Sequence, residues 1–310
     1  MRIIIDTDAG VDDAQAIMMA LSHSGATVEA MTTVTGNVHV DWVTRNVFTV
    51  LDIVGATVPV YRGADTPLMP GYWEPETRVH GEDGLGNYRR RGNQRHSVEP
   101  EHAASALVRL ANEAPGEYTL VALGPLTNVA LACKLDPEFP EKIRQFVFMG
   151  GTISALGNTT NVTAEFNLYC DPEAALIALA AFPMSTMLSW ETTIKHSFTW
   201  EAYDALTTIP SDAGRFFHET TQGTVAYLRQ FRERIGYLLP DPLAMAITLE
   251  PDIILNAEEH YVTVEVRGEF TRGQTVIDYF GLKGQESNVR IVTELDTDRV
   301  YQMFQQMLAG

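Results

Sequence analysis

Cysteine and long hydrophobic runs are both scarce in this chain of 310 residues. The only two cysteines, Cys133 and Cys170, are far apart and lack metal-site spacing, which is typical of buried free thiols in a reducing compartment. The longest unbroken apolar run, residues 174–182, is far shorter than the roughly 20 residues of a membrane helix. Asp6 interrupts the first apolar run too early for a secretory signal. We therefore expect a cytoplasmic protein with no membrane partner.

Basic residues are also few. The chain has 22 Lys and Arg against 40 Asp and Glu, and its formal net charge is -18 at pH 7. Nonspecific binding to nucleic acid depends on basic residues that neutralise phosphates, so no nucleic-acid partner is expected. Apolar residues make up 45% of the chain, an ordinary fraction for a globular protein. A cytoplasmic enzyme is therefore the default interpretation.

Strand-like and helix-like patterns alternate through the first two-thirds of the chain. Short apolar or β-branched runs predict strands at residues 3–5, 28–34, 58–60, 119–123, 146–149 and 184–188. Helical patterns lie between most of them, at residues 42–53, 103–111, 128–134 and 173–181. This alternation predicts right-handed βαβ units and an α/β fold with a mainly parallel central sheet flanked by helices.

The final third has a different pattern. A polar helical segment over about residues 211–234 precedes a second helical pattern, and strands at 261–266 and 289–293 and a closing helix at 296–308 follow. Residues 62–96 form a Gly- and Pro-rich loop insertion, and loops of that length are usually functional or disordered. We see no internal repeat or linker. One domain over residues 1–310 is the simplest prediction.

Four carboxylates follow the first predicted strand within eight residues. Asp6, Asp8, Asp12 and Asp13 flank a predicted turn, after which an amphipathic run indicates a helix. Open α/β sheets bind ligands beside the carboxyl ends of central strands. Acids packed there need a cation or hydrogen-bond donors, and an all-oxygen cluster favours Ca²⁺ or Mg²⁺. The alternative is structural, because aspartates also cap helices and form turns.

Polar or Gly-rich segments also follow the later strands, at residues 33–37, 79–86, 123–128, 148–151, 164–167, 171–172 and 239–245. Each alone is a turn or cap signal. Asp171-Pro172 and Asp241-Pro242 both match a helix N-cap followed by proline at the first helical position. Together, these segments predict one polar crevice along the strand ends.

This set of motifs resembles the inosine-uridine nucleoside hydrolase family. Residues 6–13, Asp-Thr-Asp-Ala-Gly-Val-Asp-Asp, match the family's fingerprint D-x-D-x-G-x-D-D. Further matches recur in the family's order over nearly the whole chain: Asn37, His80-Gly81, Gly124 to Asn128, Met149-Gly-Gly151, Glu165-Phe-Asn167 and Asp241-Pro242. The resemblance implies a single-domain, Rossmann-like fold with its active site at the strand ends. It also implies hydrolysis of the N-glycosidic bond of ribonucleosides, a tightly bound Ca²⁺, and a homodimer or homotetramer.

The resemblance further implies which residues hold the ion. The family's ligands correspond to Asp8, both carboxylate oxygens of Asp13, Asp241 and the backbone carbonyl of Leu123. Water and the ribose 2′- and 3′-hydroxyls would complete the shell, and such a mixture of oxygens suits calcium. Asp8 would then act as general base on the activated water. Nearby carboxylates would stabilise an oxocarbenium-like ribosyl cation.

The substrate contacts are implied in the same way. Asp12, Asn37 and Asn167 would bind the 2′- and 3′-hydroxyls, while Asn158 and Glu165 would bind the 5′-hydroxyl. Such binding predicts selectivity against deoxyribose, because an unpaired buried polar group is costly.

Three more residues receive expected positions from the same comparison. Met149 is expected beneath the sugar, and His80 near the base or the loop. Asp6 is expected to be structural, with hydrogen bonds to the turn that presents Asp8.

Two segments depart from the family's pattern. Many members have His directly before the last metal-binding Asp, where it is thought to protonate the departing base, and this chain has Pro240. Loss of a general acid typically costs about 10²- to 10⁴-fold in rate. Tyr227 and Tyr237 are candidate donors, and Trp73 is a candidate for stacking on the base, although aromatic residues more often pack in cores. In residues 189–192, Ser-Trp-Glu-Thr replaces a Leu-Asp-Val-Thr-like run, so we expect Trp190 to reshape the pocket wall.

Two other functions fit parts of the sequence. A haloacid dehalogenase-type phosphatase also begins with a strand and D-x-D, as in residues 6–8, but no Gly-Asp-x-x-x-Asp motif follows the lysines here. A calcium-dependent nucleoside- or ribose-binding protein without turnover is the other alternative, because Pro240 replaces an acid while the metal and sugar groups persist. Hydrolysis is the main interpretation because Asp8 and all its expected metal partners are present.

Overall fold

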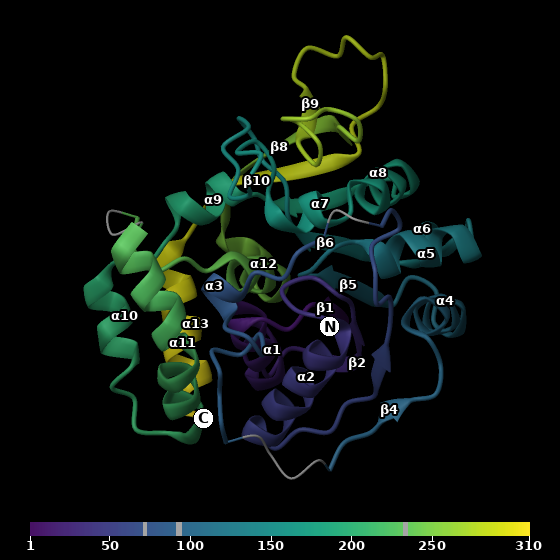
Figure 1. Ribbon diagram of the computed structural model, residues 1–310. Coiled ribbons are helices and arrows are strands. Elements are labelled where there is room, and N and C mark those ends of the chain that lie inside the picture. The colour runs from purple at the N-terminus through teal and green to yellow at the C-terminus, as the bar shows by residue number, and fades with distance from the viewer. Residues whose placement is uncertain (71–72, 91–94, 232–234) are drawn as a thin grey trace.

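The computed structural model describes residues 1–70, 73–90, 95–231 and 235–310. Ten strands form its sheet: β1 (Arg2–Thr7), β2 (Thr27–Thr33), β3 (Val60–Arg62), β4 (Val98–Glu99), β5 (Tyr118–Ala122), β6 (Gln145–Met149), β7 (Ser185–Leu188), β8 (Ile254–Val264), β9 (Thr275–Asp278) and β10 (Val289–Leu295). Their order is β4-β3-β2-β1-β5-β6-β7-β10-β8-β9. All pairs from β4 to β10 are parallel, and β8 and β9 add antiparallel pairs at one end. The predicted mainly parallel α/β sheet is confirmed, and Figure 1 shows β4 and β9 at its opposite ends.

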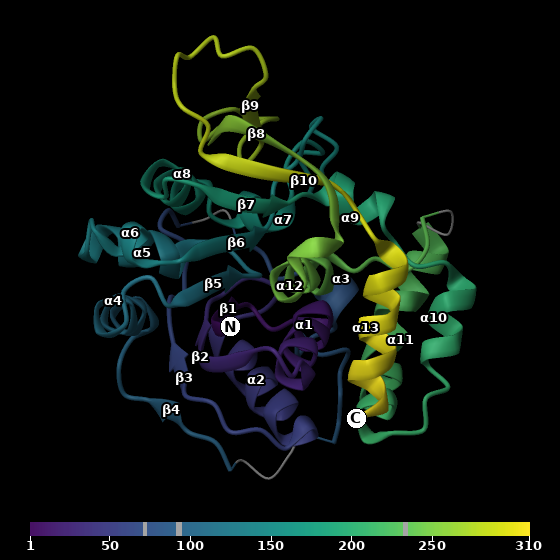
Figure 2. The ribbon, with the colours of Figure 1, turned by 180° about the vertical axis from the view of Figure 1, so that it is seen from behind.

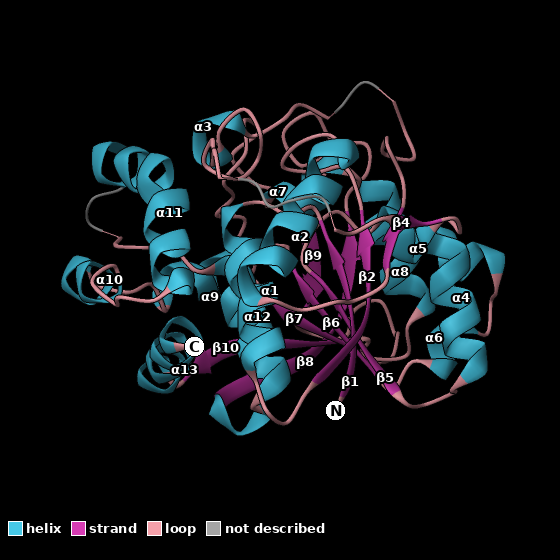
Figure 3. Cartoon of the chain, turned by 90° about the horizontal axis from the view of Figure 1, so that it is seen from below, coloured by secondary structure: helices cyan, strands magenta, loops and turns pink. Residues whose placement is uncertain are grey.

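Helices cover both faces of the sheet (Figures 2 and 3). One face carries α1 (Val11–Ser22), α2 (Val40–Val54), α11 (Asp212–Phe231), α12 (Pro240–Leu249) and α13 (Thr297–Ala309). The other face carries α4 (Ala103–Glu113), α5 (Thr127–Leu135), α6 (Phe139–Lys142) and α8 (Pro172–Ala181). Five short helices complete the described set: α3 (Thr77–His80), α7 (Phe166–Cys170), α9 (Trp190–Lys195), α10 (Trp200–Leu206) and the 3₁₀ helix η1 (Pro251–Ile253).

Strand β1 shows how the sequence produces these two layers. Successive side chains of a strand point to opposite faces, so Ile3 and Ile5 enter the core under α1 and α12 while Ile4 enters the core under α4 and α5. All three side chains are fully buried. A continuous run of isoleucine is therefore the expected sequence of a central strand that is covered on both faces.

Each strand and helix predicted in the first two-thirds lies within a few residues of an observed element, and the short elements α3, β4, α6, α7 and α9 were not predicted. Residues 63–97 connect β3 and β4 and contain α3, and residues 71–72 and 91–94 of the predicted insertion lie outside the described residues. The predicted helix at 211–234 is α11, and its last three predicted residues are also outside them. The strand expected from residue 261 begins at Ile254. Cys133 and Cys170 are buried and free, as expected. Within the described ranges, no helix is both long and apolar enough to cross a membrane.

Candidate active site

The candidate site lies where the sheet order reverses direction. From β1, the chain builds outward through β2, β3 and β4, then returns to place β5 on the other side of β1. Adjacent strand ends diverge at such a switch point, which is where open α/β sheets bind ligands. Asp6 and Thr7 end β1, and Asp8 follows directly.

Asp6 stabilises this strand end but does not hold the turn. Its Oδ1 accepts hydrogen bonds from Thr32 Oγ1 at 2.5 Å and from Asn128 Nδ2 at 2.8 Å. The expected bonds to the turn are made by Thr7 instead, whose hydroxyl accepts from the Ala9 amide at 3.0 Å and donates to Asp13 at 2.5 Å. The expectation for the partners of Asp6 is therefore wrong, because its carboxylate faces β2 and α5.

The turn brings the acids of α1 beside Asp8. Ala9 has a positive φ of 23°, and the Gly10 amide donates to Asp13 Oδ2 at 2.8 Å. A Cβ atom on Gly10 would lie 2.5 Å from Asn37 Nδ2 and 2.6 Å from His80 Nδ1, so only glycine fits this close approach. The turn therefore allows Asn37 and His80 to pack against the chain that connects β1 to α1.

The carboxylate of Asp8 occupies a space left by two glycines. A Cβ atom on Gly36 would overlap this carboxylate, and one on Gly124 would lie 2.9 Å from its Oδ1. The Asn37 amide donates to Oδ2 at 2.7 Å. Oδ1 is buried and has no hydrogen-bond partner among the described residues. A buried anionic oxygen without a donor is costly unless a cation compensates it.

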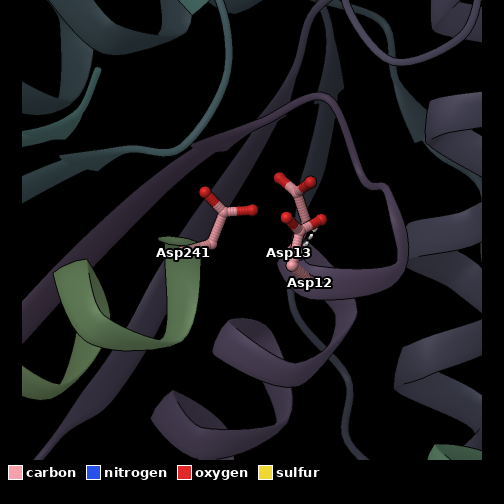
Figure 4. A group of neighbouring side chains, drawn as sticks. All are labelled: Asp12, Asp13 and Asp241. Atoms are coloured by element: carbon pink, nitrogen blue, oxygen red, sulfur yellow. Dashed lines mark hydrogen bonds between the residues drawn. The ribbon is translucent and has the colours of Figure 1, made fainter. Parts of the chain in front are cut away.

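Three more carboxylates face a common space beside Asp8. Oxygen atoms of Asp12, Asp13 and Asp241 lie within 4.8 Å of one another, and Figure 4 shows the Asp241 carboxylate facing the pair from α1. Burial raises the pKa of Asp12 and of Asp13 to about 6. Burial, followed by the negative charge of Asp13, raises the pKa values of Asp8 and Asp241 well above the usual range. Such an oxygen cluster can hold a hard divalent cation.

Asp241 reaches this space through the start of α12. Pro240 occupies the first helical position and Leu239 is the N-cap, so Asp241 is the second helical residue. The prediction of Asp241 as an N-cap is therefore wrong, because proline at position 240 starts the helix one residue earlier than assumed. Asp171, by contrast, caps α8 as predicted and accepts from the Ala174 amide at 3.1 Å.

A cavity that opens to solvent adjoins the acid cluster. Ten of the predicted site residues line it: Asp12, Asn37, His80, Leu123, Met149, Asn158, Glu165, Asn167, Tyr227 and Asp241. Asp8 and Asp13 are completely buried beside it. Trp73 does not line it, and its indole N–H donates to the Gly36 carbonyl at 2.5 Å. Trp190, which the departure at residues 189–192 singled out, forms part of the wall.

One end of the cavity is built from the residues that follow β5 and β6. Asn167 Nδ2 donates to the Leu123 carbonyl at 2.7 Å and to the Met149 carbonyl at 3.1 Å. Glu165 caps α7 by accepting from the amides of Asn167 and Leu168, and it also accepts from the Gly151 amide. Burial nevertheless raises the pKa of Glu165 to about 7. The Leu123 carbonyl accepts one hydrogen bond, from Asn167, so its second lone pair remains available to a ligand.

His80 and Tyr227 lie at the side of the cavity formed by α3 and α11. Burial lowers the pKa of His80 to about 4, so its ring is neutral at pH 7. His80 Nδ1 accepts from the Val11 amide at 3.1 Å, which leaves the ring hydrogen on Nε2. The Tyr237 hydroxyl accepts from Gln15 Nε2 at 2.7 Å.

The sequence shows no sign of several residues of the cavity wall: Glu76, Arg78, Thr224, Leu228 and Leu238. Val11, Val79 and Phe166 also line the cavity and lie within predicted segments, although no role was predicted for them. Arg78 forms a two-fold ion pair with Glu76, at 2.7 and 2.9 Å. Neither residue belongs to a motif. They reach the cavity through the fold of the insertion, which sequence patterns do not describe.

Comparison with known proteins agrees with this geometry. The family model for inosine-uridine preferring nucleoside hydrolases matches residues 3–302. A non-specific ribonucleoside hydrolase RihC of Escherichia fergusonii is 35% identical over 311 residues, covering 100% of this chain and 98% of that protein. RihC of Shigella sonnei is 36% identical with the same coverage.

Solved structures show the same relationship. An inosine-guanosine nucleoside hydrolase superposes with a TM-score of 0.91 at 34% identity, over 99% of this chain and 98% of that one. A purine-preferring ribonucleoside hydrolase from Gardnerella vaginalis also gives 0.91, at 27% identity over 100% and 98% of the two chains. The chain belongs to the inosine-uridine preferring nucleoside hydrolase family.

Proposed function

We propose that this protein hydrolyses the N-glycosidic bond of ribonucleosides to ribose and a free base. The observation that carries the proposal is the shared cavity that Asp12 and Asp241 line together with Asn37 and Asn167. Carboxylates that favour a cation lie there beside groups that can bind vicinal hydroxyls. The names of the relatives, which describe ribonucleoside hydrolases, support the same reaction.

We propose calcium as the resident ion, held by Asp8, Asp13, Asp241 and the Leu123 carbonyl. The buried, unpartnered Oδ1 of Asp8 and the converging carboxylates fit a hard cation with many oxygen ligands. When bound, calcium would polarise a water molecule and lower its pKa. Asp12 also belongs to the oxygen cluster, so its carboxylate has two possible partners, the ion and the ribose.

Asp8 is proposed as the general base that takes a proton from the attacking water. Its carboxylate is held by the Asn37 amide and confined by Gly36 and Gly124, so its orientation is set before substrate binds. The surrounding carboxylates favour positive charge, which suits the ribosyl cation that develops as the bond breaks.

The ribose is proposed to bind between the two sets of amides. Asp12, Asn37 and Asn167 would bind the 2′- and 3′-hydroxyls, and Asn158 and Glu165 the 5′-hydroxyl, with Met149 below the ring. All six residues line one cavity. Asn158 Oδ1 is buried and has no hydrogen-bond partner among the described residues, so it can accept from a hydroxyl.

The base is proposed to lie between His80 and Tyr227. His80 is neutral at pH 7 and can donate a hydrogen bond through Nε2. Because its pKa is low, its ring does not carry the second proton that a general acid would transfer to the base. Pro240 offers no proton. Tyr227 is our candidate proton donor, because it lines the cavity and is partly exposed, whereas the alternative, Tyr237, is almost completely buried.

We also propose that the chain is one catalytic domain, that it works in the cytoplasm and that it forms a homodimer or homotetramer. The continuous ten-stranded sheet supports the first proposal, and the buried free thiols support a reducing compartment. The oligomeric state rests on the family resemblance and is measurable by light scattering.

The test is ribose release from a panel of inosine, adenosine, guanosine, uridine and cytidine in the presence of calcium. Release of ribose with free base supports the proposal, and the ranking of the panel reports how the base is recognised. Binding without release would instead identify a nucleoside-binding protein. Phosphate release from phosphate esters in Mg²⁺ would identify a phosphatase.

A further inference from the structure

Glu191, in the first turn of α9, binds the backbone of a loop that leads into the cavity. Its Oε2 accepts from the Ile153 amide at 2.8 Å, and its Oε1 accepts from the Ser154 amide at 2.8 Å and the Leu156 amide at 3.3 Å. The Ser154 hydroxyl also donates to Oε1, at 3.2 Å. One carboxylate thus fixes three backbone amides within four residues. Hydrogen bonds to a charged acceptor are the stronger kind.

The loop that Glu191 binds, residues 152–158, has a strained conformation. Ala155 has a φ of 57°, in the left-handed region that costs a non-glycine residue free energy. Beyond it, the Gly157 amide donates to the Val162 carbonyl and the Asn158 amide to the Ala164 carbonyl. The second part of the loop is therefore held by the backbone of residues 162–164. In the first part, Thr275 bonds to Thr152 and the Tyr279 hydroxyl donates to the Ile153 carbonyl, while Glu191 holds the amides of residues 153, 154 and 156.

Asn158 is the point at which this loop reaches the cavity. Its side chain lines the cavity, and its Oδ1 is buried without a hydrogen-bond partner among the described residues. Only one residue separates Asn158 from Leu156, the last amide that Glu191 holds. The amides of Gly157 and Asn158 are anchored to Val162 and Ala164, so the conformation of residues 153–156 sets the direction from which the chain enters this anchored pair.

We propose that Glu191 is a positioning residue that sets Asn158 for the 5′-hydroxyl of the ribose. The inference rests on the proposed nucleoside hydrolysis and assigns a role to the segment where the chain departs from its family, Ser-Trp-Glu-Thr at 189–192. Glu191 does not touch the substrate. It acts by holding residues 153–156 in the conformation that directs Asn158 Oδ1 into the cavity.

This role differs from a contribution to overall stability. Ser154 and Leu156 are exposed, so water can reach their amides when the carboxylate is removed. Removal of the carboxylate should therefore make the loop less ordered and leave the packing of the core unchanged. The effect on catalysis should then depend on whether the substrate has a 5′-hydroxyl for Asn158 to bind.

The experiment compares the calcium-loaded wild type with E191A, E191Q and N158A on inosine and 5′-deoxyinosine. E294A is the matched control, because Glu294 pairs at 3.5 Å with Lys195, which is in α9 as Glu191 is, and because Glu294 is not among the residues that bind the loop.

We expect E191A to lower kcat/KM for inosine about 10-fold, the size of one well-placed hydrogen bond. E191Q should lose less, because it keeps one acceptor oxygen. Activity on 5′-deoxyinosine should change by less than about twofold, and E294A should match the wild type.

The double variant E191A/N158A provides the second readout. If Glu191 acts through Asn158, the double variant is no worse on inosine than N158A alone. Equal losses on both substrates, or additive losses in the double variant, would overturn the positioning role while leaving nucleoside hydrolysis intact. Absence of ribose release by the wild type would overturn the proposed function itself.

Discussion

At the scale of single residues, the site holds several acidic side chains close together, and their negative charges repel one another. Asp8, Asp13 and Asp241 are buried together. Burial raises their pKa values, and so does the negative charge of neighbouring aspartates: Asp12 for Asp13, and mainly Asp13 for Asp8 and Asp241. Clusters of this kind reduce the free energy of unfolding of a metal-free protein, so their presence points to function rather than stability. The unpartnered Oδ1 of Asp8 supports the same conclusion.

Asp241→Asn should raise the stability of the metal-free protein above that of the metal-free wild type. It should also reduce the stabilisation that calcium provides. The substitution removes one of the repelling charges, which raises the thermal midpoint without calcium. It also removes a proposed ligand, which reduces the increase in midpoint that calcium produces in the wild type. Thermal unfolding with and without calcium measures both effects. Asp252→Asn, at an exposed position, is the control, and an unchanged response to calcium in Asp241→Asn would contradict the assignment.

Glu165→Gln should flatten the dependence of stability on pH. Burial raises the pKa of Glu165 in the folded state from 4.5 to about 7. Between these pH values the unfolded state has released the proton and the folded state has kept it, so stability falls as pH rises. Two and a half pH units correspond to about 3 kcal/mol. Urea unfolding of the metal-free protein measures the free energy of unfolding at pH 5 and at pH 8. Its decrease between the two should be smaller in Glu165→Gln than in the wild type or in Glu269→Gln, a control at an exposed position. Equal decreases in all three proteins would exclude the raised pKa.

The sequence predicts some residues of the site better than others. Asp8, Asp13 and Asp241 are predictable because they belong to motifs that follow a strand or begin a helix. Arg78 and Thr224 are not, because they enter the cavity from the insertion and from the middle of a polar helix. Trp73 shows the reverse error, since an aromatic residue in the insertion need not face the cavity, and this one donates to Gly36.

At the scale of elements, the site depends on how β1, its turn and α1 meet the neighbouring loops. The β1–α1 connection presents Asp8, Asp12 and Asp13 from one short segment, and α12 brings Asp241 from far along the chain. Glycine at positions 36 and 124 allows the loops after β2 and β5 to close around the Asp8 carboxylate. The site is thus a product of close backbone packing as much as of charge.

Gly36→Ala should therefore damage the site although it adds only a methyl group. Its Cβ atom would overlap the Asp8 carboxylate and must displace it. A displacement of about 1 Å typically costs about 100-fold in kcat/KM, which ribose-release kinetics would measure. Gly223→Ala, which meets no atom within 4 Å on α11, is the matched control and should leave activity unchanged. Equal activity of the two variants would show that the carboxylate needs no such space.

Element prediction succeeded where strand and helix patterns alternate and failed where that alternation ends. Strand β8 begins seven residues before the predicted start at 261, because its first half, Ile-Leu-Asn-Ala-Glu-Glu-His, has no regular apolar pattern and lies at an antiparallel, partly exposed end of the sheet. Strands β4 and β9 were not predicted. The first has two residues and the second has four, and both include an exposed position, so neither is long enough to show a periodic pattern. Strands covered on both faces, such as β1 and β5, have the clearest sequence pattern.

At the scale of the whole molecule, one sheet places distant motifs at one edge. The parallel strands from β1 to β7 end on the same side, and residues that end or follow β1, β2, β5, β6 and β7 line one cavity. Fold class and the location of the site are therefore predictable from the sequence. The shape of the end of the cavity where we propose that the base binds is not, because it depends on the packing of α11 and the insertion against each other.

Removal of calcium should destabilise the whole protein. A ligand present at 100 times its Kd stabilises the folded state by about 2.7 kcal/mol, which corresponds to several degrees in the thermal midpoint of a protein of this size. Prolonged chelation should lower the midpoint and abolish ribose release, and added calcium should restore both. Full activity in protein shown by elemental analysis to lack calcium would refute the proposed cofactor.

The most direct test of the account is ribose release from inosine by wild type and Asp8→Asn, each loaded with calcium and checked by circular dichroism. Loss of a general base typically costs about 10²- to 10⁴-fold, so the variant should retain the fold and lose nearly all turnover. Asp252→Asn should retain full activity. Unchanged turnover in Asp8→Asn would contradict the assignment of Asp8 as the base that activates water.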